Sequence, residues 1–204
     1  NGLYPTLFMD YIPNGTLEDA IKKKPNWWNQ TTKLKAIFGI ANALAYMFAH
    51  NIIHRDLKTL NILINKDYED FGLARQIVSG EKNDVTKKIG SFHYMAPELY
   101  ISDIHLNYTY EVDSYAFGVI LFKILSDCED NLVYPKEVNN FESYLRNKLD
   151  DFKRKPPKGT HNLFVSIINA CWNVSIKERP DPPTIYCELL DAIAKNEKLM
   201  PDAD

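Results

Sequence analysis

The chain has 204 residues, of which 45% are hydrophobic and 25% charged, a composition typical of one globular domain and not of a disordered chain. Its net charge of -3 and pI near 6.0 exclude the strong positive field that would gather nucleic acid or an anionic membrane, so no nucleic-acid partner is expected. Its three cysteines show no C-x-x-C spacing, which argues against a disulfide framework and a zinc site and favours a cytoplasmic location.

A strand and a short helix are the first predicted elements. Residues 3–12 are aromatic and apolar and run into Pro-Asn-Gly at 13–15, the pattern of a buried strand followed by a turn. Thr16 then starts the sequence Thr-Leu-Glu-Asp, in which the hydroxyl can cap a helix and Asp19 can return the hydrogen bond. We expect this helix to stop before Pro25.

A long amphipathic helix is predicted over 30–50. Its apolar residues recur at steps of three and four, at Leu34, Ile37, Phe38, Ala41, Leu44, Ala45 and Phe48. The most apolar stretch, 36–49, is 14 residues long and falls short of the roughly 18 needed for a membrane span. No membrane span is therefore expected in this chain.

The remaining predicted elements form one continuous unit without repeats or long linkers. Residues 62–64 are a short apolar strand, 73–95 a polar loop, and 115–125 a helix that is apolar nearly all round and therefore central. Three further helices are predicted by the same periodicity, at 141–152, 163–172 and 184–194.

The sequence His-Arg-Asp-Leu-Lys-Thr-Leu-Asn at 54–61 carries the clearest chemistry. Phosphoryl transfer needs a carboxylate near the acceptor hydroxyl and cations that spread the charge of the phosphate. This octapeptide resembles the catalytic loop of protein kinases. By that resemblance Asp56 orients the acceptor hydroxyl and accepts its proton, Lys58 neutralises the γ-phosphate of ATP, and Asn61 binds Mg²⁺.

Two further motifs follow in the order found in that family. Asp70-Phe71-Gly72 resembles the motif whose aspartate binds Mg²⁺ between the phosphates, and Ala96-Pro97-Glu98 ends a segment that resembles the one receiving the substrate peptide. Three motifs in the same order make the resemblance far more specific than one short match.

The segment 7–12 resembles the strand and hinge that hold adenine. By that resemblance Met9 lies behind the base, Asp10 and Ile12 offer backbone groups to it, and Leu63 forms an apolar floor. A plain core strand is the alternative for 7–12. Thr16 could meet the ribose, although a role as helix cap explains it equally well.

Two positions outside the site match residues that hold it in place. Asp113 falls where the family's central helix carries an aspartate that accepts hydrogen bonds from the catalytic-loop backbone. Its alternative is an exposed acid at a helix start. Arg179 matches the arginine that pairs with the last residue of the Ala-Pro-Glu motif, Glu98, and we expect a buried ion pair.

Lys58 is the pattern of serine/threonine kinases, and Asn-Gly-Thr-Leu, Ser-Phe-His-Tyr-Met-Ala-Pro-Glu and Cys-Trp resemble the tyrosine-kinase-like group among them. Arg55 beside Asp56 implies control by phosphorylation of the segment 70–98, by an upstream kinase or by the protein itself. Ser79 and Thr86 are the candidate acceptors.

We therefore predict an α+β, protein-kinase-like fold: a mainly α-helical C-terminal lobe with a short β-hairpin at the catalytic loop. Residues 1–15 would be the last strand of the N-terminal lobe and the hinge, and 16–204 the C-terminal lobe. The N-terminal lobe is expected to be absent from this chain, because neither G-x-G-x-x-G nor a lysine in a Val-Ala-Ile-Lys setting occurs in it.

One departure from the family lies between Ile64 and Asp70. Only 65–69 separate them, so a two-residue turn leaves three residues for the return strand, about four fewer than the family's usual spacing. Either Asp70 is displaced from its magnesium position or a short segment is missing from the sequence.

The predicted function is transfer of the ATP γ-phosphate to serine or threonine of protein substrates, with this chain alone inactive. The alternatives are a pseudokinase that serves as an interaction module and a small-molecule phosphotransferase. The second would lack the Ala-Pro-Glu motif at 96–98.

Overall fold

The computed structural model describes residues 11–65, 71–73, 94–101, 109–127, 156–173 and 175–200. Its helices are α1 (Leu17–Lys23), α2 (Gln30–Ala49), α3 (Glu98–Ile101), α4 (Tyr110–Ser126), α6 (Asn162–Cys171) and α7 (Pro182–Ala194). Its strands are β1 (Ile62–Ile64) and β2 (Phe71–Leu73), and η1 (Thr59–Asn61) and η5 (Ile176–Glu178) are short 3₁₀ helices.

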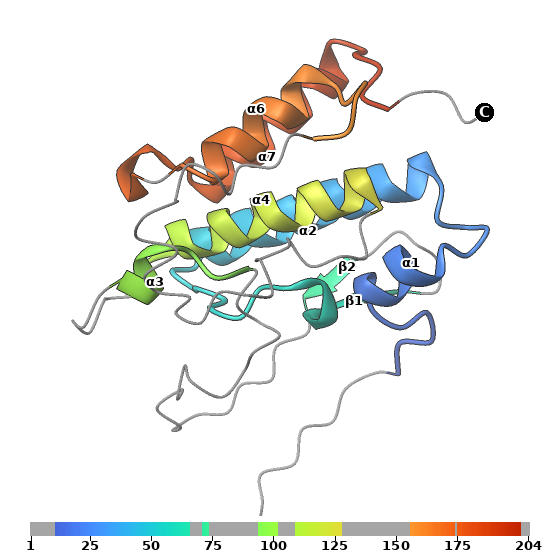
Figure 1. Ribbon diagram of the computed structural model, residues 1–204, viewed down its shortest axis with the longest axis horizontal. Helices are drawn as coiled ribbons and strands as arrows, with labels where there is room; N and C mark the ends of the chain where they lie inside the picture. Colours follow the sequence, from blue (N-terminus) through green and yellow to red (C-terminus); the bar gives the residue numbers. More distant parts are fainter. Residues whose placement is uncertain are drawn as a thin grey trace, which may run out of the picture.

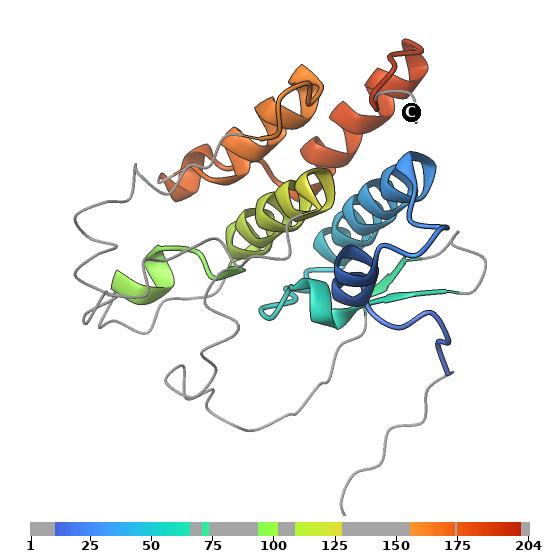
Figure 2. The same cartoon turned by 45° about the vertical axis from the view of Figure 1, so that its right-hand side comes forward.

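The helices α2 and α4 lie side by side in the middle of the molecule (Figure 1). On one side, α7 packs against α2 and α6 packs against α4. On the other side lie α1 and the β-hairpin, with β2 in contact with α2 (Figure 2). The prediction of a mainly helical lobe with a short hairpin is confirmed.

The central helix α4 is buried over most of its circumference, as the nearly all-round apolar sequence at 115–125 predicts. It begins at Tyr110, five residues before the predicted start, because its first turn carries Glu111 and Asp113 and therefore lacks the apolar signal. Gly118 lets α6 approach α4 closely, since a Cβ atom there would lie 2.7 Å from the Cβ atom of Cys171. Any larger residue at this position would push the two helices apart.

The start of α1 is the predicted capping box. The backbone N–H of Asp19 donates to Oγ1 of Thr16 at 3.1 Å, and the backbone N–H of Thr16 donates to Oδ2 of Asp19 at 3.2 Å. The helix ends at Lys23, and Lys24 follows in the left-handed conformation, with φ of 44°. The predicted stop before Pro25 is confirmed.

The hairpin differs from the expected arrangement. The antiparallel pairs are Ile62 with Leu73, Leu63 with Gly72, and Ile64 with Phe71. The return strand is thus formed by Phe-Gly-Leu, and Leu73 belongs to it and not to the predicted loop. The polar residues 67–69, where the return strand was expected, lie outside the described residues. The apolar Phe-Gly-Leu segment suits a strand packed on α2 better than that polar run does.

The second edge of β1 is covered by the turn that precedes α1. Ile64 donates its backbone N–H to the carbonyl oxygen of Gly15 at 3.0 Å, and Thr16 forms an isolated antiparallel bridge with Leu63. Gly15 has φ of 74°, a conformation that a glycine adopts without strain. The short strand therefore has neighbours on both edges and is not exposed to pairing with another chain.

The helices near the C-terminal end start within two residues of their predicted positions. The helix α7 begins at Pro182 because proline suits the first helical position and Asp181 caps it, accepting the N–H of Thr184 at 2.8 Å. The predicted helix at 141–152 and nearly all of the predicted strand at 3–12 lie outside the described residues. Within the described ranges, no helix is long and apolar enough to cross a membrane.

Candidate active site

The loop after α2 carries the predicted catalytic residues, and Asp113 of α4 holds it in place through backbone hydrogen bonds. Oδ2 of Asp113 accepts the backbone N–H of His54 at 2.6 Å, and Oδ1 accepts that of Arg55 at 3.0 Å. Asp113 is buried in the first turn of α4, so the alternative of an exposed helix-start acid is wrong. The two bonds fix Arg55 in a left-handed conformation, with φ of 68°, and thereby set the direction in which the chain enters Asp56.

The structure brings Asp56, Lys58 and Asn61 together. Lys58 Nζ lies 3.1 Å from Oδ1 and 3.0 Å from Oδ2 of Asp56. The side-chain amide of Asn61 donates to the carbonyl oxygen of Asp56 at 2.7 Å and to its Oδ2 at 2.9 Å. The Asp56 side chain is nevertheless 45% exposed. Its carboxylate is therefore held in one orientation and remains accessible to an incoming hydroxyl.

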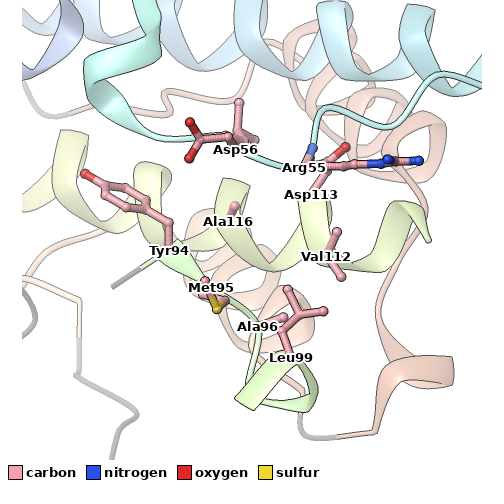
Figure 3. Close-up of a pocket in the computed structure, with 10 residues that line it drawn as sticks. Arg55, Asp56, Tyr94, Met95, Ala96, Leu99, Val112, Asp113 and Ala116 are labelled. Atoms are coloured by element: carbon pink, nitrogen blue, oxygen red, sulfur yellow. Dashed lines mark hydrogen bonds between the residues drawn. The ribbon is translucent and has the colours of Figure 1, made fainter. Parts of the chain in front are cut away.

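A cavity of roughly 50 Å³ lies beside Asp56, between the catalytic loop and the segment 94–99. Figure 3 shows the Asp56 carboxylate and the Tyr94 ring on the same side of this cavity, while the Arg55 guanidinium extends to the opposite side. Met95 and Leu99 contribute apolar lining. The cavity is far smaller than the roughly 300 to 1,000 Å³ of a typical small-molecule pocket, so a nucleotide does not fit here.

The far end of the segment 94–98 is anchored by the predicted ion pair. Arg179 donates from its two terminal nitrogens to Oε1 and Oε2 of Glu98 at 2.6 and 2.7 Å, a bidentate geometry. Nε of Arg179 donates to the carbonyl oxygen of Asn173 at 2.9 Å, and the guanidinium lies 5.1 Å from the centre of the Tyr115 ring. The expected ion pair is confirmed, with the Arg179 side chain fully buried and the Glu98 side chain 13% exposed. It ties the C-terminal helices to the wall of the site.

Burial around this pair also changes the titration of Tyr115. Removal from water raises the pKa of Tyr115 to about 12, with the positive charge of Arg179 opposing the shift and the negative charge of Glu98 adding to it. The phenol is therefore neutral throughout the physiological range.

The residues predicted for ATP and metal are covered only in part. Leu63 is half-buried and lies on the face of β1 opposite to the fully buried Ile62 and Ile64. This position suits a side chain that packs under the adenine ring. Ile12 is also half-buried. Met9, Asp10 and Asp70 lie outside the described residues.

Asn61 offers the kind of oxygen ligand that magnesium takes, and this donor chemistry fits the ion. Phe71 pairs with Ile64, which follows Asn61 by three residues. At roughly 3.3 Å per residue, the described part of the Asp-Phe-Gly motif therefore lies about 10 Å from Asn61 along the strand. In the described part of the chain, no cluster of three or more His, Cys, Asp or Glu side chains could hold a metal ion.

Sequence reasoning missed two charged residues next to the catalytic loop, Glu18 on α1 and Lys123 on α4. Both are buried, and their charged groups lie 3.5 Å apart. A signal was present for Lys123, since it is the one charged residue in the otherwise apolar stretch 115–125 of α4. Glu18 carries no such signal, because acids are common in the first turn of a helix.

Comparison with known proteins shows one consistent family. The model of the protein kinase domain matches residues 3–189. The chain is 31% identical to the probable serine/threonine-protein kinase PBL28 of Arabidopsis thaliana, over 97% of this chain and 58% of that protein. It is 31% identical to the probable serine/threonine-protein kinase roco5 of Dictyostelium discoideum, over 90% of this chain and 7% of that protein. It is 27% identical to serine/threonine-protein kinase STY46 of A. thaliana, over 91% and 31% respectively. The chain thus spans less than two thirds of the length of these relatives.

Proposed function

The chain belongs to the protein kinase family, and we propose from this premise that the full-length protein is a serine/threonine kinase that transfers the γ-phosphoryl group of ATP to protein hydroxyl groups. The observation that carries the proposal is the half-exposed carboxylate of Asp56, oriented by Lys58 and Asn61 on a loop that Asp113 fixes. The names of the relatives, which are serine/threonine kinases, support the same class of acceptor.

In this mechanism Asp56 orients the acceptor hydroxyl and takes its proton. The acceptor oxygen forms a bond to the γ-phosphorus while the bond to the oxygen bridging the β- and γ-phosphates breaks, and ADP leaves. The Lys58 ammonium lies 3.0 Å from Asp56, which supports its proposed role of neutralising charge on the transferred group.

ATP and Mg²⁺ are the substrate and ion that this family uses, and specific residues are proposed to hold them. Asn61 and Asp70 would bind Mg²⁺, which spreads the charge on the phosphate oxygens when bound. Met9, Asp10, Ile12 and Leu63 would contact the adenine, and Lys58 the γ-phosphate.

We also propose the finer assignments that the sequence supports. Lys58 favours serine or threonine over tyrosine, and membership of the tyrosine-kinase-like group is consistent with it. Arg55 is exposed and could pair with a phosphate on the segment 70–98. Ser79 and Thr86, the candidate acceptors there, lie outside the described residues. A cytoplasmic location is a prediction from the cysteine usage and from the absence of a predicted membrane span.

A second candidate function, an interaction module without catalysis, is favoured by the hairpin register. Phe71 and Gly72 are part of β2 and pair with Ile64 and Leu63. In the family's usual arrangement the return strand instead precedes the Asp-Phe-Gly motif and delivers it to the site. Such a protein would keep the fold and the substrate-facing surface without turnover.

Incubating the full-length protein with radiolabelled ATP and peptides that contain serine, threonine or tyrosine tests both candidates. The proposed function predicts label on serine or threonine that disappears in Asp56→Asn and persists in Asp191→Asn, an exposed aspartate remote from the loop. Label on tyrosine alone would contradict the assigned acceptor class. ATP binding with no label on any peptide would favour the interaction module.

A further inference from the structure

Four buried polar side chains from four separate parts of the chain meet beside the catalytic loop. They are Glu18 of α1, Thr59 of η1, Tyr94 at the start of the segment 94–98, and Lys123 of α4, and we call them the Tyr94 cluster. Their exposed fractions are 9%, 0%, 7% and 2%. Buried polar groups are costly unless each finds a partner, so the cluster is a specific arrangement and not a solvated surface.

The hydrogen bonds of the Tyr94 cluster have a fixed direction. The Thr59 hydroxyl donates to Oε2 of Glu18, and Oγ1 of Thr59 lies 2.5 Å from the hydroxyl oxygen of Tyr94. Since an ionised carboxylate only accepts and Thr59 has a single hydroxyl hydrogen, Tyr94 must donate to Thr59. The result is a chain from Tyr94 through Thr59 to the Glu18 carboxylate, in which each bond polarises the next.

Lys123 and Lys22 keep that carboxylate charged. Nζ of Lys22 lies 3.0 Å from Oε1 of Glu18, and Nζ of Lys123 lies 3.5 Å from Oε2. Burial alone would raise the pKa of Glu18, but the hydrogen bond from Thr59 and the two ammonium groups outweigh it and hold the pKa below its ordinary value. Lys123 also lies 5.2 Å from the centre of the Tyr94 ring, within cation–π range.

The position of the cluster connects the two parts of the site that must act together. Thr59 lies between Asp56 and Asn61 in the catalytic loop, and Tyr94 precedes Met95, which lines the cavity beside Asp56. The other end of the segment 94–98 is held by the pair of Glu98 with Arg179. The bond between Thr59 and Tyr94 therefore sets the distance between the catalytic carboxylate and the wall that faces it.

We propose that Glu18, Thr59, Tyr94 and Lys123 are positioning residues, which fix the segment 94–98 against the catalytic loop so that the acceptor hydroxyl of a protein substrate lies in line with Asp56. This inference rests on the proposed kinase function. It assigns a role in substrate presentation to Glu18 and Lys123, which belong to the helices α1 and α4 and not to the loop that carries Asp56.

Thr59 offers the sharpest test, because two substitutions separate its hydroxyl from its shape. Thr59→Val removes the hydroxyl and Thr59→Ser retains it. Thr32→Val is the matched control, since Thr32 is also buried and its hydroxyl donates to the carbonyl oxygen of Trp27 at 2.7 Å, away from the Tyr94 cluster. In the full-length protein, Thr59→Val should lower kcat/KM for a peptide substrate by about 10-fold or more, because small misplacements of reacting groups are costly. KM for ATP should stay within about twofold.

The same variants of the 204-residue chain allow a measurement that needs no catalysis. Backbone hydrogen exchange should become faster in both 54–61 and 94–101 in Thr59→Val, and Thr59→Ser should restore the slow rates. Lys123→Met should act as Thr59→Val does. Lys33→Met, which removes a buried lysine 2.5 Å from Asp127, should leave both segments unchanged.

The outcomes separate failure of this inference from failure of the proposed function. Absence of phosphotransfer by the wild-type protein would defeat the proposed function, and the exchange measurement would still decide whether the cluster couples the two segments. Equal effects of Thr59→Val and Thr32→Val on exchange, or equal changes in KM for peptide and ATP, would overturn the positioning role. A loss specific to peptide, restored by Thr59→Ser, would establish it.

Discussion

Replacing Asp113 by asparagine should loosen the catalytic loop and lower the stability of the fold together. The two carboxylate oxygens of Asp113 accept one backbone N–H each, from His54 at 2.6 Å and from Arg55 at 3.0 Å. Asparagine can accept only one of them and turns an NH₂ group toward the other. Loss of one charge-assisted hydrogen bond and burial of an unpaired N–H together cost about 2 to 4 kcal/mol. Against a total stability of about 5 to 15 kcal/mol, this loss is readily measured.

Urea unfolding followed by tryptophan fluorescence measures the free energy, and hydrogen exchange measures the two amides directly. In Asp113→Asn, protection should fall at His54 and Arg55 more than at any amide of α2. Asp191→Asn is the control, because Asp191 lies in an exposed pair with Lys195, worth about 0 to 1 kcal/mol. An Asp113→Asn protein with unchanged midpoint and unchanged protection at these two amides would refute the anchoring role.

Three further predictions concern the buried pair, acid pH and the isolated chain. Arg179→Met should lower the free energy of unfolding by about 3 to 5 kcal/mol, because it leaves the largely buried Glu98 unpaired. A loss below about 1 kcal/mol in urea titrations would contradict it. The folded-state pKa of Glu18 lies below its ordinary value of 4.5, and that of Asp19 is about 2 against an ordinary 3.8. Both groups therefore stabilise the fold above about pH 4.5 and lose that contribution as the pH falls toward about 2. The urea midpoint should drop in that window, and a midpoint that does not change with pH would contradict this prediction. The 204-residue chain should not turn over protein substrate at the roughly 1 to 100 s⁻¹ typical of kinases, since it carries no glycine-rich loop or strand lysine. A monomeric sample that reached this rate in a labelled-ATP assay would prove the prediction wrong.

Much of the fold could be predicted because its signals are local. The periodicity of α2, the capping box at Thr16 and Asp19, and the proline start of α7 are all properties of short segments. The motif at 54–61 indicated the candidate catalytic loop. The resemblance also predicted the anchoring contacts of Asp113 and Arg179, and both contacts are confirmed.

The register of the hairpin and the Tyr94 cluster could not be predicted in this way. Strand pairing depends on which segment best covers β1 and packs on α2, and the polar run at 67–69 competes poorly with Phe-Gly-Leu. The cluster joins Glu18 to Thr59 across 41 positions and Thr59 to Tyr94 across 35, and no local pattern encodes such contacts. Lys123 in an apolar helix was the single hint.

The proposed role of Asp56, to orient the acceptor hydroxyl and take its proton, is tested most directly by one substitution. In the full-length protein, Asp56→Asn should reduce phosphotransfer to a serine or threonine peptide by about 10²- to 10⁴-fold, because the general base is lost. ATP affinity measured by calorimetry should be nearly unchanged, since the carboxylate acts on the acceptor and not on the nucleotide. Turnover in Asp56→Asn equal to that of the wild-type protein would contradict the assigned role.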